Sequence, residues 1–367
     1  MSQQKNEIIS FFVTRYQVQG SQAATKGLGL RGVSGQMTID ELMLPASRLW
    51  SGEGHFDAPC VFVDLNDSGI PSGGFVMPPC PVIAIGTGAG VLATAVDAIV
   101  ADEAAASAML ANIAANPCTA AVIAELLRLL PGLPLEQGLI AESLAYGVLQ
   151  GSDEHARWLS SRPVEQAQPG GSVDISREAG RLEIALNRPL ADNAIDRAMR
   201  DDLADAFRLA ALDETITSIS LRGRGRCFSL GADLAEFGTT RDPAEAHRIR
   251  RRTLPAIWAA RCGDRLEVHV HGACVGAGLE IAAFAKRLTA APRAWFQLPE
   301  LAMGVLPGAG GCVSLTRRIG RQRTAELILG GKRLSARTAL EWGLIDALVN
   351  EALADDLASD ESGADIG

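Results

Sequence analysis

Long apolar runs, a secretory start and an excess of positive charge are all missing from this 367-residue chain. No uninterrupted apolar stretch reaches the ~18 residues that a membrane-spanning helix needs. Residues 1–7 lack the cationic and apolar segments of a secretory signal, so we expect a cytoplasmic protein. The formal net charge is −9. This charge argues against general affinity for nucleic acid or for an anionic membrane.

Paired cysteines and metal-ligand spacings are missing too. The seven cysteines are scattered, odd in number and free of any CxxC pair. Neither a disulfide framework nor a zinc site is therefore predicted, and buried reduced thiols are expected. Of the five histidines, His269 and His271 alternate on one face of a predicted strand, where we expect packed or hydrogen-bonded roles. The sequence implies no metal and no redox cofactor.

Strand and helix signals alternate in the second half of the chain, after a linker-like stretch at 166–172. Leu182, Ile184 and Leu186 alternate with polar or small neighbours, which predicts a strand. Apolar residues then recur every three or four positions over 195–210, the pattern of an amphipathic helix. Further strands are expected near 219–221 and 266–270, and a helix from about Gly278. This succession predicts an α/β layered fold with crossover connections.

The first half of the chain has a different character. Residues 1–55 carry few periodic signals, and strands are expected at 61–65 and 81–85. From 95 to about 163 the chain is rich in alanine and leucine and predicts about three helices. A short repeat links the two halves. The repeated segments are 96–102, Val-Asp-Ala-Ile-Val-Ala-Asp, and 345–351, Ile-Asp-Ala-Leu-Val-Asn-Glu.

Two glutamates stand beside glycine- or proline-marked turns and are candidate acid/base groups. Glu280 ends the glycine-rich stretch 271–280 at an otherwise apolar helix start, and Glu300 follows Pro299. A carboxyl group in apolar surroundings is desolvated, which raises its pKa and suits it to proton transfer near neutral pH. The structural alternatives are a charge that offsets a helix dipole for Glu280 and an exposed turn residue for Glu300.

The same turns offer backbone N–H groups. A glycine-rich turn between a strand and a helix leaves the first helical N–H groups without partners, and Ala277 stands at such a place. Ala232, after Gly231, is a second candidate at a separate strand exit. Two converging donors can stabilise a carbonyl oxygen as it becomes an oxyanion. A single loop of either kind is more often a structural turn than part of an oxyanion hole.

Two other motifs, and the absence of a third, bear on alternative kinds of chemistry. Residues 86–90 read Gly-Thr-Gly-Ala-Gly, but the spacing is GxGxG, and no second strand ends in an acidic residue at the expected distance. Dinucleotide binding is therefore disfavoured. A GxSxG elbow is absent from the sequence, which disfavours a Ser/His/Asp hydrolase. The basic stretch 247–252 is either a solvated helix face or a contact for a phosphate-bearing ligand.

Ordered motifs over roughly residues 173–350 make this part of the chain similar to the crotonase superfamily, the enoyl-CoA hydratase/isomerase family. The resemblance implies a repeated ββα spiral that binds acyl-CoA thioesters with the carbonyl in an oxyanion hole. It assigns the oxyanion N–H groups to Ala232 and Ala277, and the acid/base roles to Glu280 and Glu300. The residues expected to surround the substrate are Leu230, Ala232, Asp233, Leu234, Gly276 and Ala277. The motifs lie at 186–189, 228–234, 272–280, 299–300, 307–311 and 343–346.

The chain departs from the family pattern in several places. Ala277 replaces a frequent glycine, and Ala235 replaces a frequent lysine in a chain where lysine is scarce. Arginines such as Arg248, Arg251 or Arg252 are the hypothetical substitutes for contacting the phosphates of CoA. Helices usually follow the motif at 343–346, yet here the chain soon ends.

Residues 96–163 are similar to those missing helices, so the N-terminal half resembles a shrunken crotonase repeat that lacks the glutamates and the oxyanion loop. We therefore expect an α/β, crotonase-like ββα spiral core with a helical covering region. The predicted parts are a degenerate domain at 1–165, a catalytic domain at 172–352 and a disordered acidic tail at 353–367.

Both glutamates together favour an enoyl-CoA hydratase, a lyase that adds water across the C2–C3 double bond of a 2-enoyl-CoA. The alternatives are another crotonase-type reaction (isomerase, dehydratase or thioester hydrolase) and a non-catalytic protein that binds CoA esters. The resemblance implies no cofactor, since CoA arrives as part of the acyl-CoA thioester substrate. It also implies a homo-oligomer, either a trimer or a hexamer.

Overall fold

The computed structural model describes most of the chain between Met37 and Val349. The predicted disordered tail at 353–367 and most of residues 1–55 lie outside the described residues. The described residues between Ile39 and Val349 group as one compact unit. The division into domains at 1–165 and 172–352 stays a prediction. The described residues are 37–51, 58–67, 76–162 and 168–349.

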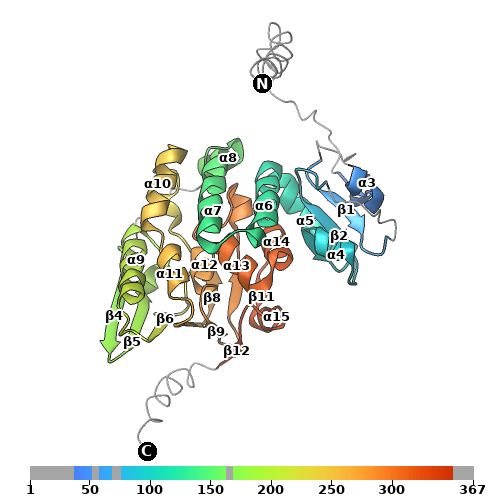
Figure 1. Cartoon of the computed structure of the whole chain (residues 1–367). Coiled ribbons are helices and arrows are strands. Elements are labelled where there is room, and N and C mark those ends of the chain that lie inside the picture. The colour runs from blue at the N-terminus through green and yellow to red at the C-terminus, as the bar shows by residue number, and fades with distance from the viewer. Residues whose placement is uncertain (1–36, 52–57, 68–75, 163–167, 350–367) are drawn as a thin grey trace, which may run out of the picture. The chain divides into compact units, whose positions relative to one another are not determined.

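A six-stranded sheet forms the centre of the C-terminal half (Figure 1). The hairpin at one edge is antiparallel, and the other neighbouring strands are parallel. Leu182, Ile184 and Leu186 are buried in their strand. The intervening helices supply the crossovers that parallel neighbours require. The order is β12 (Ala347–Leu348), β9 (Arg287–Ala290), β7 (Leu266–Val270), β6 (Ser218–Gly223), β5 (Arg181–Asn187) and β4 (Ser172–Glu178).

A smaller sheet positions the glycine-rich turns. Its order is β11 (Leu334–Ser335), β10 (Trp295–Gln297) and β8 (Ala273–Val275), and β8 and β10 are parallel. The chain leaves β8 into helix α12 (Ala277–Ala282) and leaves β10 into the 3₁₀ helix η4 (Glu300–Met303). The carboxyl ends of parallel neighbours lie at the same edge of a sheet, so the segments that follow β8 and β10 meet there.

Helices connect these strands and cover the large sheet. The predicted amphipathic helix is α9, in which Met199, Leu203 and Phe207 are buried. Asp196 caps its start by accepting a hydrogen bond from the Met199 N–H at 2.9 Å. Besides α12 and η4, the helices described in this half are α9 (Arg197–Leu212), α10 (Pro243–Thr253), α11 (Ala256–Arg261), α13 (Gly311–Ile319), α14 (Arg321–Gly330) and α15 (Ala336–Glu341), with the 3₁₀ turns η2 (Pro189–Ala191) and η3 (Leu234–Glu236).

The alanine- and leucine-rich region forms four α-helices that pack on the C-terminal half. Figure 1 shows α7 between α6 and α10, and contacts join α7 to both. Asn112 donates to the Gly330 carbonyl at 2.7 Å, and Asn116 donates to the Leu301 carbonyl at 3.0 Å. These helices therefore cover the C-terminal half. Their bounds are α5 (Glu103–Ala115), α6 (Pro117–Leu129), α7 (Leu135–Gln150) and α8 (Asp153–Ser161), with the 3₁₀ turn η1 (Leu130–Gly132) between α6 and α7.

Three short parallel strands make a separate sheet near the start of the described residues. The two strands expected at 61–65 and 81–85 are present. The expectation of helices from about residue 95 was wrong at 98–100, because this apolar run pairs with the preceding strand. The elements are α2 (Ile39–Leu42), α3 (Ala46–Ser51), β1 (Val61–Asp64), β2 (Val82–Ile85), α4 (Val91–Ala95) and β3 (Ala98–Val100).

The short sequence repeat has the same local geometry in both copies. Asp97 precedes β3, donates its N–H to the Val82 carbonyl and accepts the Val82 N–H on its carboxylate, both at 2.8 Å. Asp346 precedes β12 and makes the same two bonds to Leu288, both at 2.7 Å. The two aspartates therefore start equivalent strands. That the whole N-terminal half is a shrunken crotonase repeat stays a prediction.

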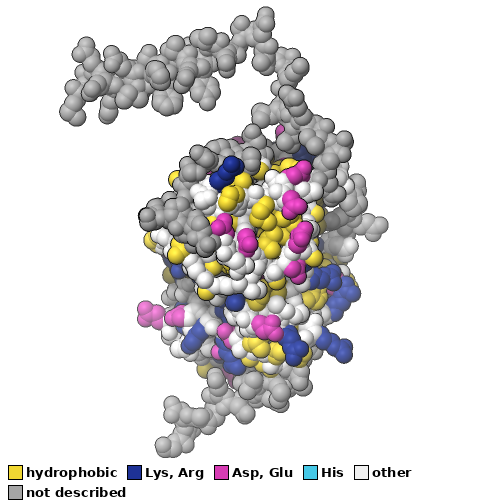
Figure 2. Space-filling model, turned by 90° about the vertical axis from the view of Figure 1, so that its right-hand side faces the viewer, with side chains coloured by type: hydrophobic (Ala, Val, Ile, Leu, Met, Phe, Trp, Pro, Cys, Tyr) yellow, Lys and Arg dark blue, Asp and Glu magenta, His cyan; other side chains and the backbone are white. Residues whose placement is uncertain are grey.

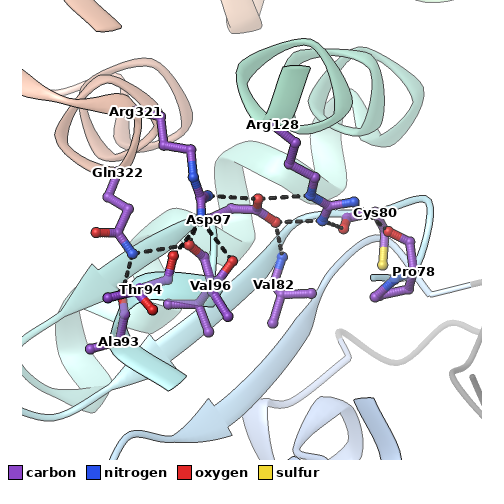
Figure 3. A network of polar contacts seen from close by, with 11 residues as sticks. Pro78, Cys80, Val82, Ala93, Thr94, Val96, Asp97, Arg128, Arg321 and Gln322 are labelled. Carbon is purple, nitrogen blue, oxygen red and sulfur yellow. Dashed lines mark hydrogen bonds and ion pairs between the residues drawn. The ribbon is translucent and has the colours of Figure 1, made fainter. Parts of the chain in front are cut away.

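Asp97 also joins three parts of the fold (Figure 3). Its carboxylate is 2% exposed and accepts from Arg128 of α6 at 2.8 and 2.5 Å. Arg321 of α14 lies 3.4 Å from the same carboxylate and donates to the Val96 carbonyl at 2.9 Å. The β1–β2–β3 sheet, the covering helices and the C-terminal half are thus connected through one buried anion.

Charges of both signs are interspersed on the face seen in Figure 2. Acidic side chains are scattered among apolar ones, and most of the Lys and Arg side chains lie in the lower half of the view. Within the described ranges, no single helix is long and apolar enough to cross a membrane. One bent pair of helices, α5 with α6–η1, has the length and the composition of a membrane span, and only those two properties indicate one. The same residues contain no cluster of His, Cys, Asp or Glu suited to a metal ion.

Candidate active site

A cavity of about 580 Å³ is lined by the segments that follow β8 and β10. All the residues predicted to surround the acyl thioester or to act in catalysis line this cavity, whereas Arg248, Arg251 and Arg252, the hypothetical contacts for the CoA phosphates, do not. Covering helices α7 and α8 contribute further walls, as does α10. The predicted residues in its lining are Leu230, Ala232, Asp233, Leu234, Gly276, Ala277, Glu280 and Glu300.

The two candidate N–H donors lie on loops that are tied together. The Ser229 N–H donates to the Ala273 carbonyl, and the Val275 N–H donates back to the Ser229 carbonyl, both at 3.0 Å. Gly231 has φ of 92°, and a Cβ there would lie 2.9 Å from the Val275 carbonyl oxygen. Glycine is therefore required for this close approach.

Ala232 and Ala277 each follow a glycine in the left-handed region. Ala277 is the first residue of α12, after Gly276 at φ 47°. Neither alanine N–H donates to an acceptor within the part of the chain that the structure describes. Both donors are thus available to a bound group, as the first N–H groups of a helix commonly are.

Glu280 is buried and held by the turn that follows Pro307. Its Oε2 atom accepts hydrogen bonds from the Ala309 N–H at 2.6 Å and the Gly311 N–H at 2.8 Å. Burial raises the pKa of Glu280 to about 7, and these two N–H donors oppose the increase. A Cβ at Gly311 would lie 2.4 Å from the Cγ of Glu280, so the turn needs glycine to accommodate this side chain.

Glu300 lies beside the turn at Gly276, which precedes Ala277, and fewer hydrogen bonds hold its carboxyl group than hold that of Glu280. A Cβ at Gly276 would lie 2.8 Å from the Oε1 atom of Glu300. Its Oε2 atom is buried and has no hydrogen-bond partner among the described residues. Burial raises the pKa of Glu300 well above its usual range, and the charge of Glu280 adds to the effect. Two carboxyl groups with different affinities for a proton therefore share one cavity.

Several motif residues support the loops. Arg188, which is 5% exposed, donates to the carboxylate of Asp233 at 2.7 Å. Asp233 also accepts the Ala235 N–H at 2.9 Å, so its carboxylate anchors the loop beside the cavity. Asn193 is fully buried and donates to the carbonyls of Cys227 and Phe228 at 3.0 and 3.1 Å. The 186–189 motif thus fixes the loop that carries Ala232.

The sequence reasoning missed the contributions of the covering helices. Glu142 of α7 is 2% exposed and accepts the Gly310 N–H at 2.7 Å and the Val313 N–H at 3.2 Å. Burial raises the pKa of Glu142 well above its usual range, and the charge of Glu280 raises it further. The signal was a glutamate on the buried stripe of an apolar helix, which also includes Leu139 and Ser143.

Two further residues of the covering helices line the cavity. The ring of Tyr146 packs directly on Gly308, where an added Cβ would lie only 2.2 Å from the Cδ2 atom of the ring. His155 is buried and donates from Nδ1 to the Met303 carbonyl at 2.8 Å, and its ring stacks on Trp158. Burial lowers the pKa of His155.

The arginines of α10 differ in their surroundings. Arg248 pairs with Glu245 at 2.7 Å on an exposed helix face, where it does not line the cavity. Arg250, which belongs to the basic stretch 247–252, lines the cavity together with Arg197 and Arg200. Contact of Arg248, Arg251 or Arg252 with the phosphates of CoA stays a hypothesis.

Residues 176–359 match the family model described as enoyl-CoA hydratase/isomerase. The chain belongs to the enoyl-CoA hydratase/isomerase family. The crotonase superfamily resemblance is confirmed by this match and by the curated relatives. The predicted α/β fold class, with a crotonase-like core and a helical covering region, is confirmed as well.

Among curated proteins, the 2,3-dehydroadipyl-CoA hydratase of Escherichia coli (strain K12) is 34% identical over 173 residues, 47% of this chain and 66% of that protein. A probable enoyl-CoA hydratase of Mycobacterium leprae is 35% identical over 178 residues, 47% of this chain and 66% of that protein. The chain thus spans just under two thirds of the length of these relatives. The crystal structure of enoyl-CoA hydratase from Thermoplasma volcanium GSS1 is 36% identical, covering 51% of this chain and 76% of that one, with a TM-score of 0.45.

Proposed function

We propose that this chain is an enoyl-CoA hydratase that adds water across the C2–C3 double bond of a 2-enoyl-CoA thioester. The observation that carries the proposal is the arrangement of Glu280 and Glu300. Both carboxyls are buried in one cavity beside the available N–H groups of Ala232 and Ala277. Membership of the hydratase/isomerase family supports it. The family resemblance also supports a homo-oligomer, a trimer or hexamer.

In the proposed reaction, the thioester oxygen accepts hydrogen bonds from Ala232 and Ala277. These donors stabilise the negative charge that develops on that oxygen as the enolate forms. Glu280, whose pKa is raised to about 7, takes a proton from water while the water oxygen bonds to C3. Glu300, whose pKa is raised by burial and by the charge of Glu280, delivers a proton to C2. The product is a 3-hydroxyacyl-CoA.

The test is the loss of enoyl-thioester absorbance with a panel of 2-enoyl-CoA substrates of different chain length. Glu280→Gln and Glu300→Gln should each lower kcat by roughly 10²–10⁴-fold, since each removes a proton-transfer group. Glu326→Gln on α14 is the matched control. Burial raises the pKa of Glu326 to about 6, but this side chain does not line the cavity.

Other outcomes would assign other functions. Turnover that survives both glutamine substitutions would contradict hydration by these two carboxyls. Tight binding of acyl-CoA without turnover of any enoyl-CoA would favour a protein that binds CoA esters without catalysis. Turnover of a 3-enoyl-CoA without net addition of water would favour an isomerase.

A further inference from the structure

The cavity contains a cation that the proposed proton transfers do not use. Arg250 of α10 is half-buried and lines the cavity, along with Tyr146 and Gln150 of α7. An arginine side chain keeps its charge under all physiological conditions, so its guanidinium brings a permanent positive charge to a mostly apolar cavity.

Every hydrogen-bond acceptor that Arg250 has in the described residues is neutral. Nε donates to the Ser143 hydroxyl at 3.2 Å, Nη1 to the Gln150 side-chain oxygen at 3.0 Å, and Nη2 to the Ser143 carbonyl at 3.0 Å. Its guanidinium lies over the Tyr146 ring, 4.5 Å from the centroid. These contacts fix the orientation of the guanidinium without neutralising its charge.

No carboxylate of the described residues forms an ion pair with Arg250. Glu142 is near enough to influence it electrostatically, but its two oxygens accept the N–H groups of Gly310 and Val313. A partly desolvated charge without a counter-ion is unfavourable, whereas an anion that enters the cavity would relieve the cost. Two N–H groups of the guanidinium fork remain for such an anion, because three of the five have acceptors.

The cation lies one aromatic ring away from the acid/base site. The ring of Tyr146 has Arg250 over it and also packs against Gly308, next to Ala309, which donates to Glu280. A substrate with its C2–C3 bond beside Glu280 would therefore direct the far end of a short acyl chain toward the guanidinium.

We propose that the acyl group carries a distal carboxylate and that Arg250 binds it, an inference that rests on the proposed function. The substrate class is then the CoA monothioesters of unsaturated dicarboxylic acids. Arg250 is a specificity-determining residue, and Ser143, Gln150 and Tyr146 hold it in place. Planar guanidinium and carboxylate groups match in a two-bond pairing, which a neutral acyl terminus cannot form.

Two substrates of equal chain length test the proposal. Hex-2-enedioyl-CoA and hex-2-enoyl-CoA differ in the group at the far end of the acyl chain, a carboxylate or a methyl. The wild type should have at least roughly tenfold higher kcat/KM for the dicarboxylic substrate, a difference of about 1.4 kcal/mol. Arg250→Gln should abolish this preference, because kcat/KM for the dicarboxylic substrate should fall by at least roughly tenfold relative to kcat/KM for hex-2-enoyl-CoA in the same variant.

Arg261→Gln is the matched control. Arg261 also reaches from the catalytic half to α7, where it pairs with Glu136 at 2.7 Å, and it lies over the Trp258 ring, but outside the cavity. It should keep the wild-type preference. Arg250→Lys keeps the positive charge but not the planar guanidinium that makes two hydrogen bonds to a carboxylate. This variant should keep part of the preference for the dicarboxylic substrate.

Binding of the saturated thioesters separates this inference from the proposed function. By calorimetry, adipyl-CoA should bind at least roughly tenfold tighter than hexanoyl-CoA to the wild type and about equally to Arg250→Gln. If no enoyl-CoA is turned over, the proposed hydratase function is wrong. The difference in affinity between adipyl-CoA and hexanoyl-CoA still tests whether Arg250 binds a distal carboxylate. A wild type without the preference overturns the proposal, as does an Arg250→Gln variant that retains it.

Discussion

Glu280 and Glu300 have the same chemistry but different surroundings. Glu280 accepts two backbone N–H groups, which stabilise its anion, while one oxygen of Glu300 has no partner in the described part of the chain. Burial raises the pKa of both, to about 7 for Glu280 and well above its usual range for Glu300, where the charge of Glu280 adds to the effect of burial. Near neutral pH, Glu280 is therefore the better base and Glu300 the better acid.

The first prediction is a bell-shaped dependence of kcat/KM on pH. The rate should rise with pH through about 7, because Glu280 must lose its proton to act as a base. It should fall at higher pH, where Glu300 loses the proton that it donates. Measurements at constant ionic strength from about pH 5 to about pH 10 would define both limbs. Residual activity of Glu300→Gln should lack the descending limb, and a flat profile between those limits would contradict the assignment.

The second prediction concerns the glycine beneath Glu280. In Gly311→Ala the added Cβ would lie 2.4 Å from the Cγ of Glu280, so the carboxyl must move away from the Ala309 and Gly311 N–H groups. We expect kcat to fall by roughly 10²-fold, the scale of a misplaced acid/base group.

Gly330→Ala at the end of α14 is the control for that substitution. Its Cβ would have one neighbour, Met109 Cε, at 3.9 Å, so we expect unchanged kcat and a gain of about 0.5–1 kcal/mol in the free energy of unfolding. Equal kcat in the two alanine variants would show that the close contact at Gly311 is unimportant.

At the scale of elements, the sequence predicted what local patterns encode. The alternation in β5 and the apolar period of α9 are visible in any short window, and both elements are present. The turns around Glu280 and Glu300 were also identifiable, because glycine and proline mark them locally. β3 was missed, since a three-residue strand in an alanine-rich stretch has no period of its own and depends on pairing with β2.

Contacts between distant segments could not be predicted in the same way. Glu142 meets the Gly310 N–H across 168 residues of sequence, and Arg250 meets Ser143 across 107. Nothing near Glu142 or Arg250 in the chain indicates these partners, because the packing of α7 on the catalytic half creates them. The local motifs therefore gave Glu280, Glu300, Ala232 and Ala277, but not the walls that the covering helices supply.

The third prediction compares the two aspartates of the repeat. Asp97→Asn would leave Arg128 and Arg321 without their buried anion, whereas the amide oxygen can still accept the Val82 N–H. We expect a loss of about 3–5 kcal/mol in the free energy of unfolding, the usual cost of breaking a buried ion pair from one side.

Asp346→Asn is the matched change at the other copy. The Asp346 side chain is 44% exposed where it pairs with Arg318, so its loss should cost about 0–1 kcal/mol. Denaturant unfolding of both variants would measure the difference. Similar losses in the two would mean that the Asp97 network contributes no more than a surface pair.

At the scale of the whole molecule, helices that precede the catalytic core in the sequence complete its cavity. Tyr146 and His155 line that cavity. Glu142 accepts the Gly310 N–H of the same turn whose Ala309 N–H donates to Glu280. Hydrogen bonds from Asn112 of α5 and from Asn116, between α5 and α6, fix the neighbouring covering helices to α14 and η4. The site therefore depends on both halves of the chain, although the family match begins only at residue 176.

The fourth prediction follows from that dependence. A fragment of residues 170–367 should be insoluble or inactive, because removing the covering helices exposes apolar surface of α13 and α14 and opens the cavity to water. Co-expression with residues 1–169 should restore a soluble complex with measurable hydratase activity. Glu142→Ala in the N-terminal fragment should weaken this rescue, since Gly310 and Val313 then lose their acceptor. A soluble fragment 170–367 with the full activity of the intact chain would show that the first half is dispensable for the site.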